Sequence, residues 1–170
     1  VRLENGERIA CRKLILATGL VDELPEIPGL REFWGSGVFQ CPYCHGWELR
    51  GKLWAFMAPP EFVIESATLL LGWTKRLTLL TNGPAALADA DRAWLQAHAI
   101  EVIEEPIERL AGTDGTLESI RFQGGRSLAC SGLQMRNRFR QRSSLPEKLG
   151  CEVVQTGPTA GMIQTDFGGA

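Results

Sequence analysis

The stretch Leu53-Trp54-Ala55-Phe56-Met57 decides the fold, because two further segments follow it in the order of a strand–helix–strand unit. It is short and apolar, as is typical of a buried strand. Glu61 to Leu71 is a helix candidate, and Arg76 to Thr81 is a second strand that the turn residues Asn82-Gly83-Pro84 close. The three segments together predict a βαβ unit, which is the building block of a parallel sheet.

The sequence after this unit continues the alternation of helix and strand. Ala85 to His98 predicts a second helix, and Ile100 to Ile103 predicts a third strand. Two shorter β segments follow at Leu117 to Phe122 and at Arg126 to Ala129. We therefore expect the α/β class, with a Rossmann-like, three-layer nucleotide-binding domain that combines a parallel sheet with a small antiparallel β-meander.

The sequence before the unit has its own pattern. Val1 to Leu3 and Glu7 to Arg12 lie on either side of Asn5-Gly6, a pair that supplies the positive φ angles of a tight hairpin. Leu14 to Ala17 is a short apolar run, and Thr18-Gly19 ends it. The opening therefore predicts a β-hairpin followed by a short strand.

Composition limits the class of protein. The chain has 170 residues, 44% hydrophobic and 22% charged, with a formal net charge of -2, which is typical of a soluble globular protein. Its longest apolar runs, such as Ala67 to Leu71, are far below the roughly 18 residues of a membrane span. The N-terminus lacks the pattern of a signal peptide. We expect a cytoplasmic protein that spans no membrane.

Five cysteines include one closely spaced pair. An odd number of cysteines does not fit the disulfide framework of a secreted protein. Outside the pair, Cys11, Cys130 and Cys151 are predicted to be buried, small and apolar. A reducing compartment fits this pattern.

The pair lies in Cys41-Pro42-Tyr43-Cys44-His45, and these residues are the candidate catalytic group. With two intervening residues, the two thiols can close into a disulfide and open again with little movement of the backbone. His45 follows directly and has an ordinary pKa near 6.5, which suits a charged neighbour and a proton shuttle. The motif therefore predicts dithiol–disulfide chemistry at Cys41 and Cys44.

The same motif also occurs in other kinds of site. A c-type haem attachment site has the same spacing, but it requires an exported chain. A zinc site requires a second ligand pair, and Cys130 and Cys151 have no histidine nearby, so no metal is expected. A structural disulfide between Cys41 and Cys44 is the alternative that the residues leave open.

The turn of the βαβ unit is where a dinucleotide would bind. Ala58-Pro59-Pro60-Glu61 stands there in place of the expected glycines. The two prolines lack N–H donors, and Glu61 places a carboxylate where phosphates would lie. Thr81-Asn82-Gly83, after the next strand, offers neither an acid for a ribose nor arginines for a 2′-phosphate. Either this unit has lost the ability to bind NAD(P)H, or it never bound a nucleotide.

Several segments, in this order and spacing, resemble the thioredoxin reductase-like flavoproteins. The Cys-Pro-Tyr-Cys-His form is most similar to the branch that contains the gliotoxin and holomycin dithiol oxidases. The segments that carry the resemblance are Leu14 to Gly19, Ile27-Pro28-Gly29, Cys41 to Glu48, Arg140 to Leu145, Leu149 to Glu152 and Gly161 to Asp166.

The resemblance implies a division into domains. Residues 1–29 would be the end of a first FAD-domain segment, residues 30–130 an NAD(P)-binding-like domain with the thiols, and residues 131–170 a return toward the second FAD-domain part. The Gly-rich FAD motif would precede Val1 and a Gly-Asp motif would follow Ala170. The chain is thus expected to be the central part of a protein about twice its length, with an incomplete FAD site.

The resemblance also implies roles for single residues. Cys44 would face the flavin and Cys41 would exchange with substrate. His45 would be the acid/base, and Thr18 and Gly19 would lie near the FAD. The implied partner is a small-molecule dithiol or a thioredoxin-like protein, and the full-length protein would be a homodimer.

The leading hypothesis is a FAD-dependent dithiol oxidase in which a dithiol reduces the Cys41–Cys44 disulfide and then the flavin, and oxygen reoxidises the flavin. One alternative is an NAD(P)H-dependent reductase of the thioredoxin reductase type. Another is an inactive remnant or a binding module. No nucleic acid is expected, because the net negative charge favours a solvated face for the alternating Arg136, Arg138, Arg140 and Arg142.

Overall fold

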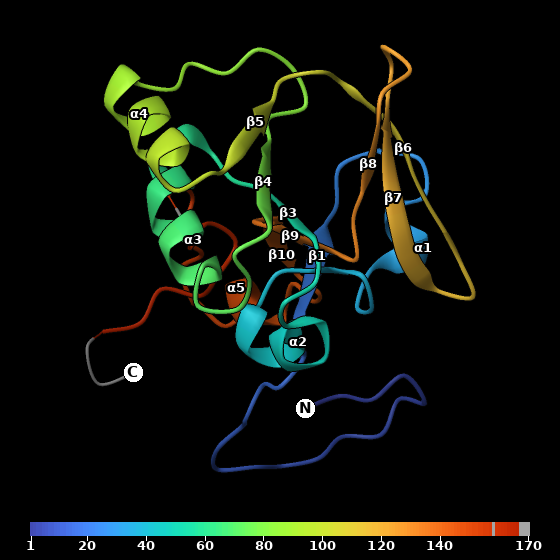
Figure 1. The fold of residues 1–170 in the computed structure, drawn as a ribbon. Coiled ribbons are helices and arrows are strands. Elements are labelled where there is room, and N and C mark those ends of the chain that lie inside the picture. Colours follow the sequence, from blue (N-terminus) through green and yellow to red (C-terminus); the bar gives the residue numbers. More distant parts are fainter. Residues whose placement is uncertain (158, 167–170) are drawn as a thin grey trace. The chain divides into compact units, whose positions relative to one another are not determined.

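The computed structural model describes residues 1–157 and 159–166, which form two compact units. The larger unit is Leu24–Asn137, and the smaller unit combines Val1–Glu23 with the described residues after Asn137. Figure 1 labels their helices and strands. Each unit has its own sheet, so each is described separately.

A five-stranded parallel sheet organises the larger unit, in the order β2-β9-β3-β4-β5. The strands are β2 (Val38–Phe39), β3 (Trp54–Met57), β4 (Leu77–Leu80), β5 (Glu101–Ile103) and β9 (Gly132–Met135). The predicted βαβ unit is confirmed as β3, α3 (Val63–Leu70) and β4. Its strands pair in parallel, with Trp54 beside Leu77.

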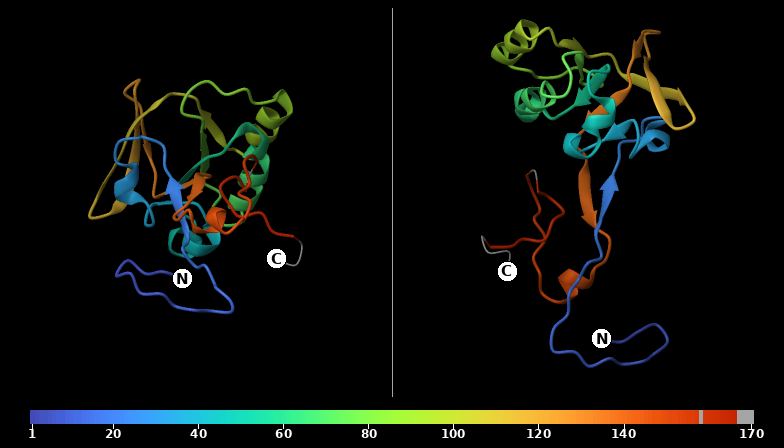
Figure 2. Two further views of the ribbon diagram at one scale, coloured as in Figure 1. Left: turned by 180° about the vertical axis from the view of Figure 1, so that it is seen from behind. Right: turned by 60° about the horizontal axis from the view of Figure 1, so that its bottom comes forward.

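The sheet lies between two layers, as Figures 1 and 2 show. Helices α3 and α4 (Asp89–Ala97) cover one face, and an antiparallel meander of β6 (Ile107–Thr113), β7 (Thr116–Phe122) and β8 (Ser127–Ala129) covers the other. Trp54 and Phe56 pack in the core on the helical side, whereas Ala55 between them packs on the meander side. This alternation follows from the two-residue period of a strand. The predicted three-layer α/β fold is confirmed.

Some predicted bounds were wrong. The helix expected from Ala85 begins only at Asp89. The helix expected from Glu61 begins at Val63, after a 3-10 turn at Pro60–Phe62. No strand was predicted at β9, which lies at residues 132–135 between β2 and β3 in the sheet. The larger unit therefore extends beyond the predicted boundary at residue 130. The assignment of the flanking stretches to a FAD domain stays a prediction.

The smaller unit is built on two antiparallel strands, β1 (Leu20–Glu23) and β10 (Arg138–Gln141). They are followed by a short helix, α5 (Leu145–Lys148). The predicted N-terminal turn is present, because Gly6 has a φ of 85° and Arg2 forms a bridge with Arg8.

The predicted strand at Leu14 to Ala17 is not formed. Ile15 is 89% exposed, and among the described residues no strand pairs with this stretch. An isolated apolar run without a neighbouring strand has no hydrogen-bond partner for its backbone, so apolar composition alone does not make it a strand.

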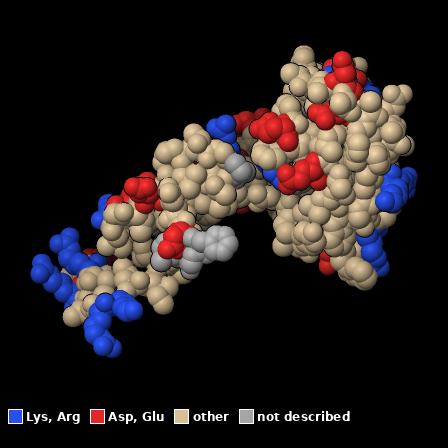
Figure 3. Space-filling view, turned by 90° about the vertical axis from the view of Figure 1, so that its left-hand side faces the viewer, with Lys and Arg blue, Asp and Glu red and all other residues tan. Residues whose placement is uncertain are grey.

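The four alternating arginines do not share one strand face. Arg136 precedes β10 and Arg142 follows it, while Arg138 and Arg140 lie on the exposed face of β10. A separate group of basic side chains lies on the N-terminal turn and is drawn in blue in Figure 3. Its exposed members are Arg2, Arg8, Arg12 and Lys13.

The helices are short. None of those in residues 1–157 and 159–166 combines the length and the hydropathy that a membrane-crossing segment needs.

Candidate active site

The two thiols lie where β2 passes into α2 (Pro42–Leu49). Cys41 is the N-cap residue of this helix, and the Cys44 backbone N–H donates to the Cys41 carbonyl over 3.2 Å. Pro42 takes the first helical position, where its missing N–H costs no hydrogen bond. The Gln134 side-chain amide donates to the Gln40 carbonyl over 3.0 Å and so fixes the residue before Cys41.

Both thiols are free, with Cys41 half-buried and Cys44 exposed. The hydrogen bond between their side chains lowers the pKa of Cys41, against a smaller opposing effect of burial. The same hydrogen bond raises the pKa of Cys44, and partial desolvation raises it further. Cys44 is therefore the proton donor of the pair, and Cys41 is the thiol that ionises first as the pH rises, which makes Cys41 the more readily formed nucleophile. His45 is not among the causes of either pKa shift.

Alkylation should show this asymmetry. At pH about 7.5, iodoacetamide should modify Cys41 before Cys44, because only the thiolate reacts. Since the pKa of Cys41 is lowered, the difference in alkylation rate between Cys41 and Cys44 should become smaller as the pH rises through 9.0, the ordinary pKa of a cysteine. Replacing Cys44 with alanine removes the main cause of the lowered pKa of Cys41 and should therefore slow alkylation of Cys41. Peptide mass spectrometry after timed quenching measures both rates, and equal rates at Cys41 and Cys44 would contradict the assignment.

The remaining cysteines divide into two kinds. Cys130 is buried, donates to the Gly132 carbonyl over 3.2 Å, and has a pKa raised to about 12 by burial. It should resist alkylation and serves as an internal control. Cys11 and Cys151 are exposed, so the prediction that they are buried was wrong. Spacing reveals which cysteines are paired, but burial depends on the tertiary surroundings.

His45 lies on α2 directly after Cys44. Its ring stacks on that of Phe39, with 5.4 Å between ring centroids and 17° between planes. His45 Nδ1 is buried without a hydrogen-bond partner. Cys44 and His45 thus lie in α2 and Cys41 is its N-cap, while the catalytic role of His45 stays a prediction.

Helix α2 packs closely on Trp73. Gly46 faces this ring, and a Cβ built at Gly46 would lie 2.7 Å from two of its carbon atoms. Tyr43 also contacts Trp73, edge to face, with 5.9 Å between ring centroids. The absence of a side chain at Gly46 therefore sets the distance between α2 and Trp73.

The effect of Gly46→Ala on the free energy of unfolding should therefore depend on residue 73. The substitution should destabilise the protein when Trp73 is present and stabilise it when a smaller residue replaces Trp73. In the native background we expect a loss of up to about 2 kcal/mol in the free energy of unfolding, because overpacking costs ~1–3 kcal/mol and alanine regains ~1 in helix propensity. In a Trp73→Leu background the same change should stabilise by about 1 kcal/mol. Urea unfolding of the four variants gives the coupling. Equal effects in the two backgrounds would show that Trp73 does not restrict Gly46.

Sequence reasoning missed Phe39, Trp73 and Gln134 as supports of the site. Of Trp47, Trp54, Trp73 and Trp94, only Trp54 is fully buried. The apolar pair Val38-Phe39, two residues before Cys41, was a usable signal for β2. Gln134 carried no comparable signal.

The carboxyl edge of the parallel sheet is where a dinucleotide would be held. Arg136, which follows β9, forms an ion pair with Glu65 of α3 over 2.7 Å, and its guanidinium lies 4.4 Å from the centre of the Phe62 ring. This pair covers the start of α3 with a carboxylate and an aromatic ring, the surroundings least suited to a pyrophosphate.

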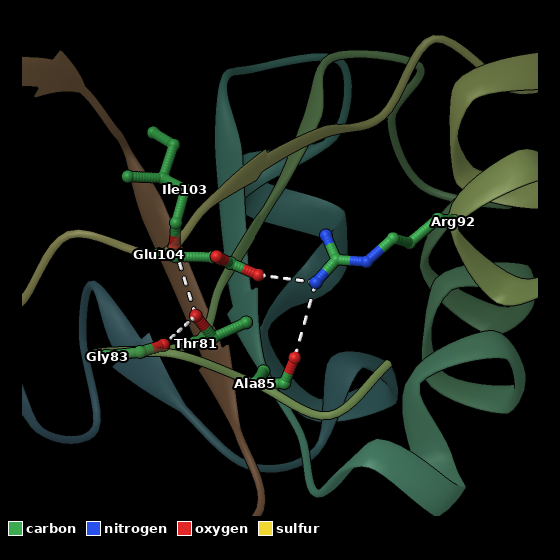
Figure 4. Close-up of polar contacts among 6 residues, drawn as sticks. All are labelled: Thr81, Gly83, Ala85, Arg92, Ile103 and Glu104. Carbon is green, nitrogen blue, oxygen red and sulfur yellow. Dashed lines mark hydrogen bonds and ion pairs between the residues drawn. The ribbon is translucent and has the colours of Figure 1, made fainter. Parts of the chain in front are cut away.

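The neighbouring strands end in a second polar group, which Figure 4 shows. The Thr81 hydroxyl donates to the Gly83 carbonyl over 2.5 Å and lies 3.4 Å from the Ile103 carbonyl. Arg92 pairs with Glu104 over 2.6 Å and donates to the Ala85 carbonyl over 3.2 Å. The Thr81 hydroxyl and the Arg92 guanidinium thus donate hydrogen bonds to groups of the larger unit, which agrees with the sequence argument against NAD(P)H.

Thr18 and Gly19, the predicted FAD contacts, belong to the smaller unit. Gly19 is exposed with a φ of 73°, and a Cβ built there would meet no atom within 4 Å. Its carbonyl accepts the Arg142 N–H over 3.3 Å. An open glycine backbone of this kind fits the close approach of a cofactor. In the described part of the chain, no cluster of three or more His, Cys, Asp or Glu could hold a metal.

Comparison with known proteins supports the resemblance. No family model matches the chain. It is 34% identical over 161 residues to thioredoxin reductase tcpT of Claviceps purpurea, covering 91% of this chain and 50% of that protein. The crystal structure of HlmI matches with a TM-score of 0.81, 35% identity, and coverage of 97% of this chain and 50% of HlmI.

An oxidoreductase from Agrobacterium tumefaciens is also similar, with 41% identity, a TM-score of 0.75 and coverage of 88% of this chain and 48% of that one. The chain thus spans about half the length of the relatives it matches. It is related to the thioredoxin reductase-like oxidoreductases, as its sequence indicated.

Proposed function

We propose that this chain carries the dithiol–disulfide centre of a FAD-dependent thiol oxidoreductase that works in the oxidase direction. The observation that supports it most is the hydrogen-bonded pair at the start of α2, in which the pKa of Cys41 is lowered and Cys44 is the exposed proton donor. A structural disulfide needs no such asymmetry. A redox pair uses it to set which sulfur exchanges with substrate.

In the proposed reaction, the pair starts as a disulfide. A substrate thiolate attacks Cys41 Sγ, the Cys41–Cys44 bond breaks, and Cys44 Sγ leaves with the bonding electrons. The second substrate thiolate attacks the first substrate sulfur and releases Cys41 as a thiolate. The substrate loses two electrons and becomes a disulfide, and the protein gains a dithiol. We assign proton exchange with these sulfurs to His45, which directly follows Cys44 in the chain.

FAD fits the residues present through the open backbone at Thr18 and Gly19. When bound, it would accept two electrons from the dithiol and pass them to molecular oxygen. The partner would be a small-molecule dithiol or a thioredoxin-like protein, and the active protein a cytoplasmic homodimer.

Reduction by NAD(P)H is the second candidate, because several relatives are named thioredoxin reductases. The carboxyl edge of the sheet argues against it. Pro59 and Pro60 occupy the turn, and the two nearby cations, Arg92 and Arg136, already pair with carboxylates. We therefore place the entry of electrons at Cys41.

An anaerobic titration of the full-length protein with its flavin bound tests the direction. Dithiothreitol should bleach the flavin absorbance, NADPH should leave it unchanged, and air should restore it with formation of hydrogen peroxide. Rapid bleaching by NADPH would overturn the oxidase direction and favour the reductase. Failure of dithiothreitol to reduce the Cys41–Cys44 disulfide would overturn the enzyme proposal in favour of a non-catalytic binding module.

A further inference from the structure

Gln134 is a polar side chain inside an apolar part of the sheet. It lies on β9 beside Phe39 of β2 and Phe56 of β3, and these two phenylalanines are at most 1% exposed. Gln134 itself is 5% exposed. Strands in the middle of a parallel sheet are normally apolar, because both of their faces are covered. A glutamine at this position therefore needs a specific hydrogen-bond partner.

The partner is the backbone carbonyl of Gln40. The Gln134 Nε2 atom donates to this oxygen over 3.0 Å, although the two residues are 94 positions apart in the sequence. A carbonyl can only accept, so the amide presents its nitrogen and not its oxygen to it. Gln40 follows β2, and its carbonyl belongs to the peptide bond that leads into Cys41. The hydrogen bond therefore acts on the peptide plane from which Cys41 extends.

Helix α2 is attached to the sheet at both of its ends. At its start, the N-cap residue Cys41 forms no capping hydrogen bond through its side chain, and Gln134 holds the preceding carbonyl. At its end, the Trp54 Nε1–H donates to the Leu49 carbonyl over 2.8 Å. Gln134 is thus the attachment at the end of α2 that carries the thiols.

The oxygen of the same amide shows that Gln134 brings little net stability. Gln134 Oε1 is buried, and within the part of the chain that the structure describes no group donates a hydrogen bond to it. The net gain from one hydrogen bond is comparable to the cost of leaving a buried acceptor unpaired. A methionine of similar length would avoid that cost. A buried polar side chain without a net gain in stability points to a role in the neighbouring site.

We propose that Gln134 is a positioning residue for the dithiol, because its amide holds the peptide plane before Cys41 in the orientation from which the Cys41–Cys44 disulfide closes. This inference rests on the proposed function. In the reduced pair the two sulfurs already lie within hydrogen-bond reach, and a fixed backbone keeps them there. Without the hydrogen bond from Gln134, the dithiol form gains conformational freedom, whereas the disulfide is still held by its covalent bond. Loss of the amide therefore disfavours the disulfide.

Equilibration with glutathione measures this effect. The dithiol gives two electrons to glutathione disulfide, the Cys41–Cys44 bond forms, and the two thiol protons go to the two glutathione molecules released. We expect the equilibrium constant for this closure to fall about fivefold in Gln134→Met, because part of the backbone freedom of one residue is regained. The exposed Cys11 and Cys151 are replaced with serine in every sample. Acid quenching, alkylation and mass spectrometry give the fraction of disulfide at each glutathione ratio.

Gln141→Met is the matched control. The Gln141 Nε2 atom donates to the Gly161 carbonyl over 2.7 Å, which is the same kind of hydrogen bond in the smaller unit. Its removal should leave the equilibrium constant unchanged. Urea unfolding of the reduced variants separates positioning from stability. The midpoint of Gln134→Met should not lie below that of the native chain, since the unpaired Oε1 is lost together with the hydrogen bond.

The outcomes for the inference and for the proposed function are distinct. An unchanged or increased equilibrium constant in a folded Gln134→Met would overturn the inference, as would an equal change in Gln141→Met. If Gln134→Met does not fold, Gln134→Leu takes its place, and loss of the fold in both would make Gln134 a structural residue and also overturn the inference. The dithiol function stands in all these cases as long as the native pair closes. A native pair that never closes with glutathione disulfide would overturn the proposed function itself.

Discussion

Replacing Cys44 with serine should stop the dithiol centre at a mixed disulfide. With glutathione disulfide, the Cys41 thiolate of the reduced native chain should attack first, and Cys44 should then displace glutathione to close the internal disulfide. Without Cys44, the second step needs a thiol from solution. Because a thiol held one helical turn away has a far higher effective concentration, we expect loss of glutathione from Cys41 to slow by at least ~10³-fold.

Intact-mass spectrometry of acid-quenched samples follows the adduct on Cys41. Cys41→Ser should form neither the internal disulfide nor a rapid adduct, since it lacks the nucleophile. Cys151→Ser removes an exposed cysteine outside the site and should behave like the native chain. If Cys41→Ser formed the adduct on Cys44 as fast as the native chain forms it on Cys41, the assignment of roles within the pair would be wrong.

Trp54→Ala should cost about 3–5 kcal/mol in the free energy of unfolding, the range for truncation of a large buried aromatic residue. Trp54 is 1% exposed in β3, packs on Phe39, and donates to the Leu49 carbonyl. The substitution leaves a cavity and removes a hydrogen bond between the sheet and the helix that carries the thiols.

Trp47→Ala is the matched control for this prediction. Trp47 is 64% exposed, and its main contact is the Arg50 guanidinium, 3.9 Å from the centre of its ring. Loss of an exposed cation–π contact costs about 0.5–1 kcal/mol. Urea unfolding followed by far-UV circular dichroism compares the two variants. Similar losses would mean that Trp54 is not a central part of the core.

Much of the fold was predictable, because it depends on short-range patterns. The run Leu53 to Met57 identified β3, and the turn residues after Arg76 to Thr81 identified the end of β4. The meander strand at Thr116–Phe122 also followed from its apolar alternation. By contrast, β9 is a four-residue strand whose neighbours β2 and β3 are distant in sequence, so no local pattern marks it.

The candidate site divides in the same way. The spacing of Cys41, Cys44 and His45 predicted the dithiol–disulfide chemistry. It did not predict which thiol holds the proton, because that depends on the hydrogen bond between the side chains.

The sequence by itself determined the α/β class, the dithiol motif and the unsuitable nucleotide turn, since each is written in neighbouring residues. Only the tertiary structure decided that the pKa of Cys41 is lowered while that of Cys44 is raised, and that Arg136 pairs with Glu65 at the sheet edge. The physical reason is that pKa values and ion pairs depend on distances between side chains, and only folding sets these distances.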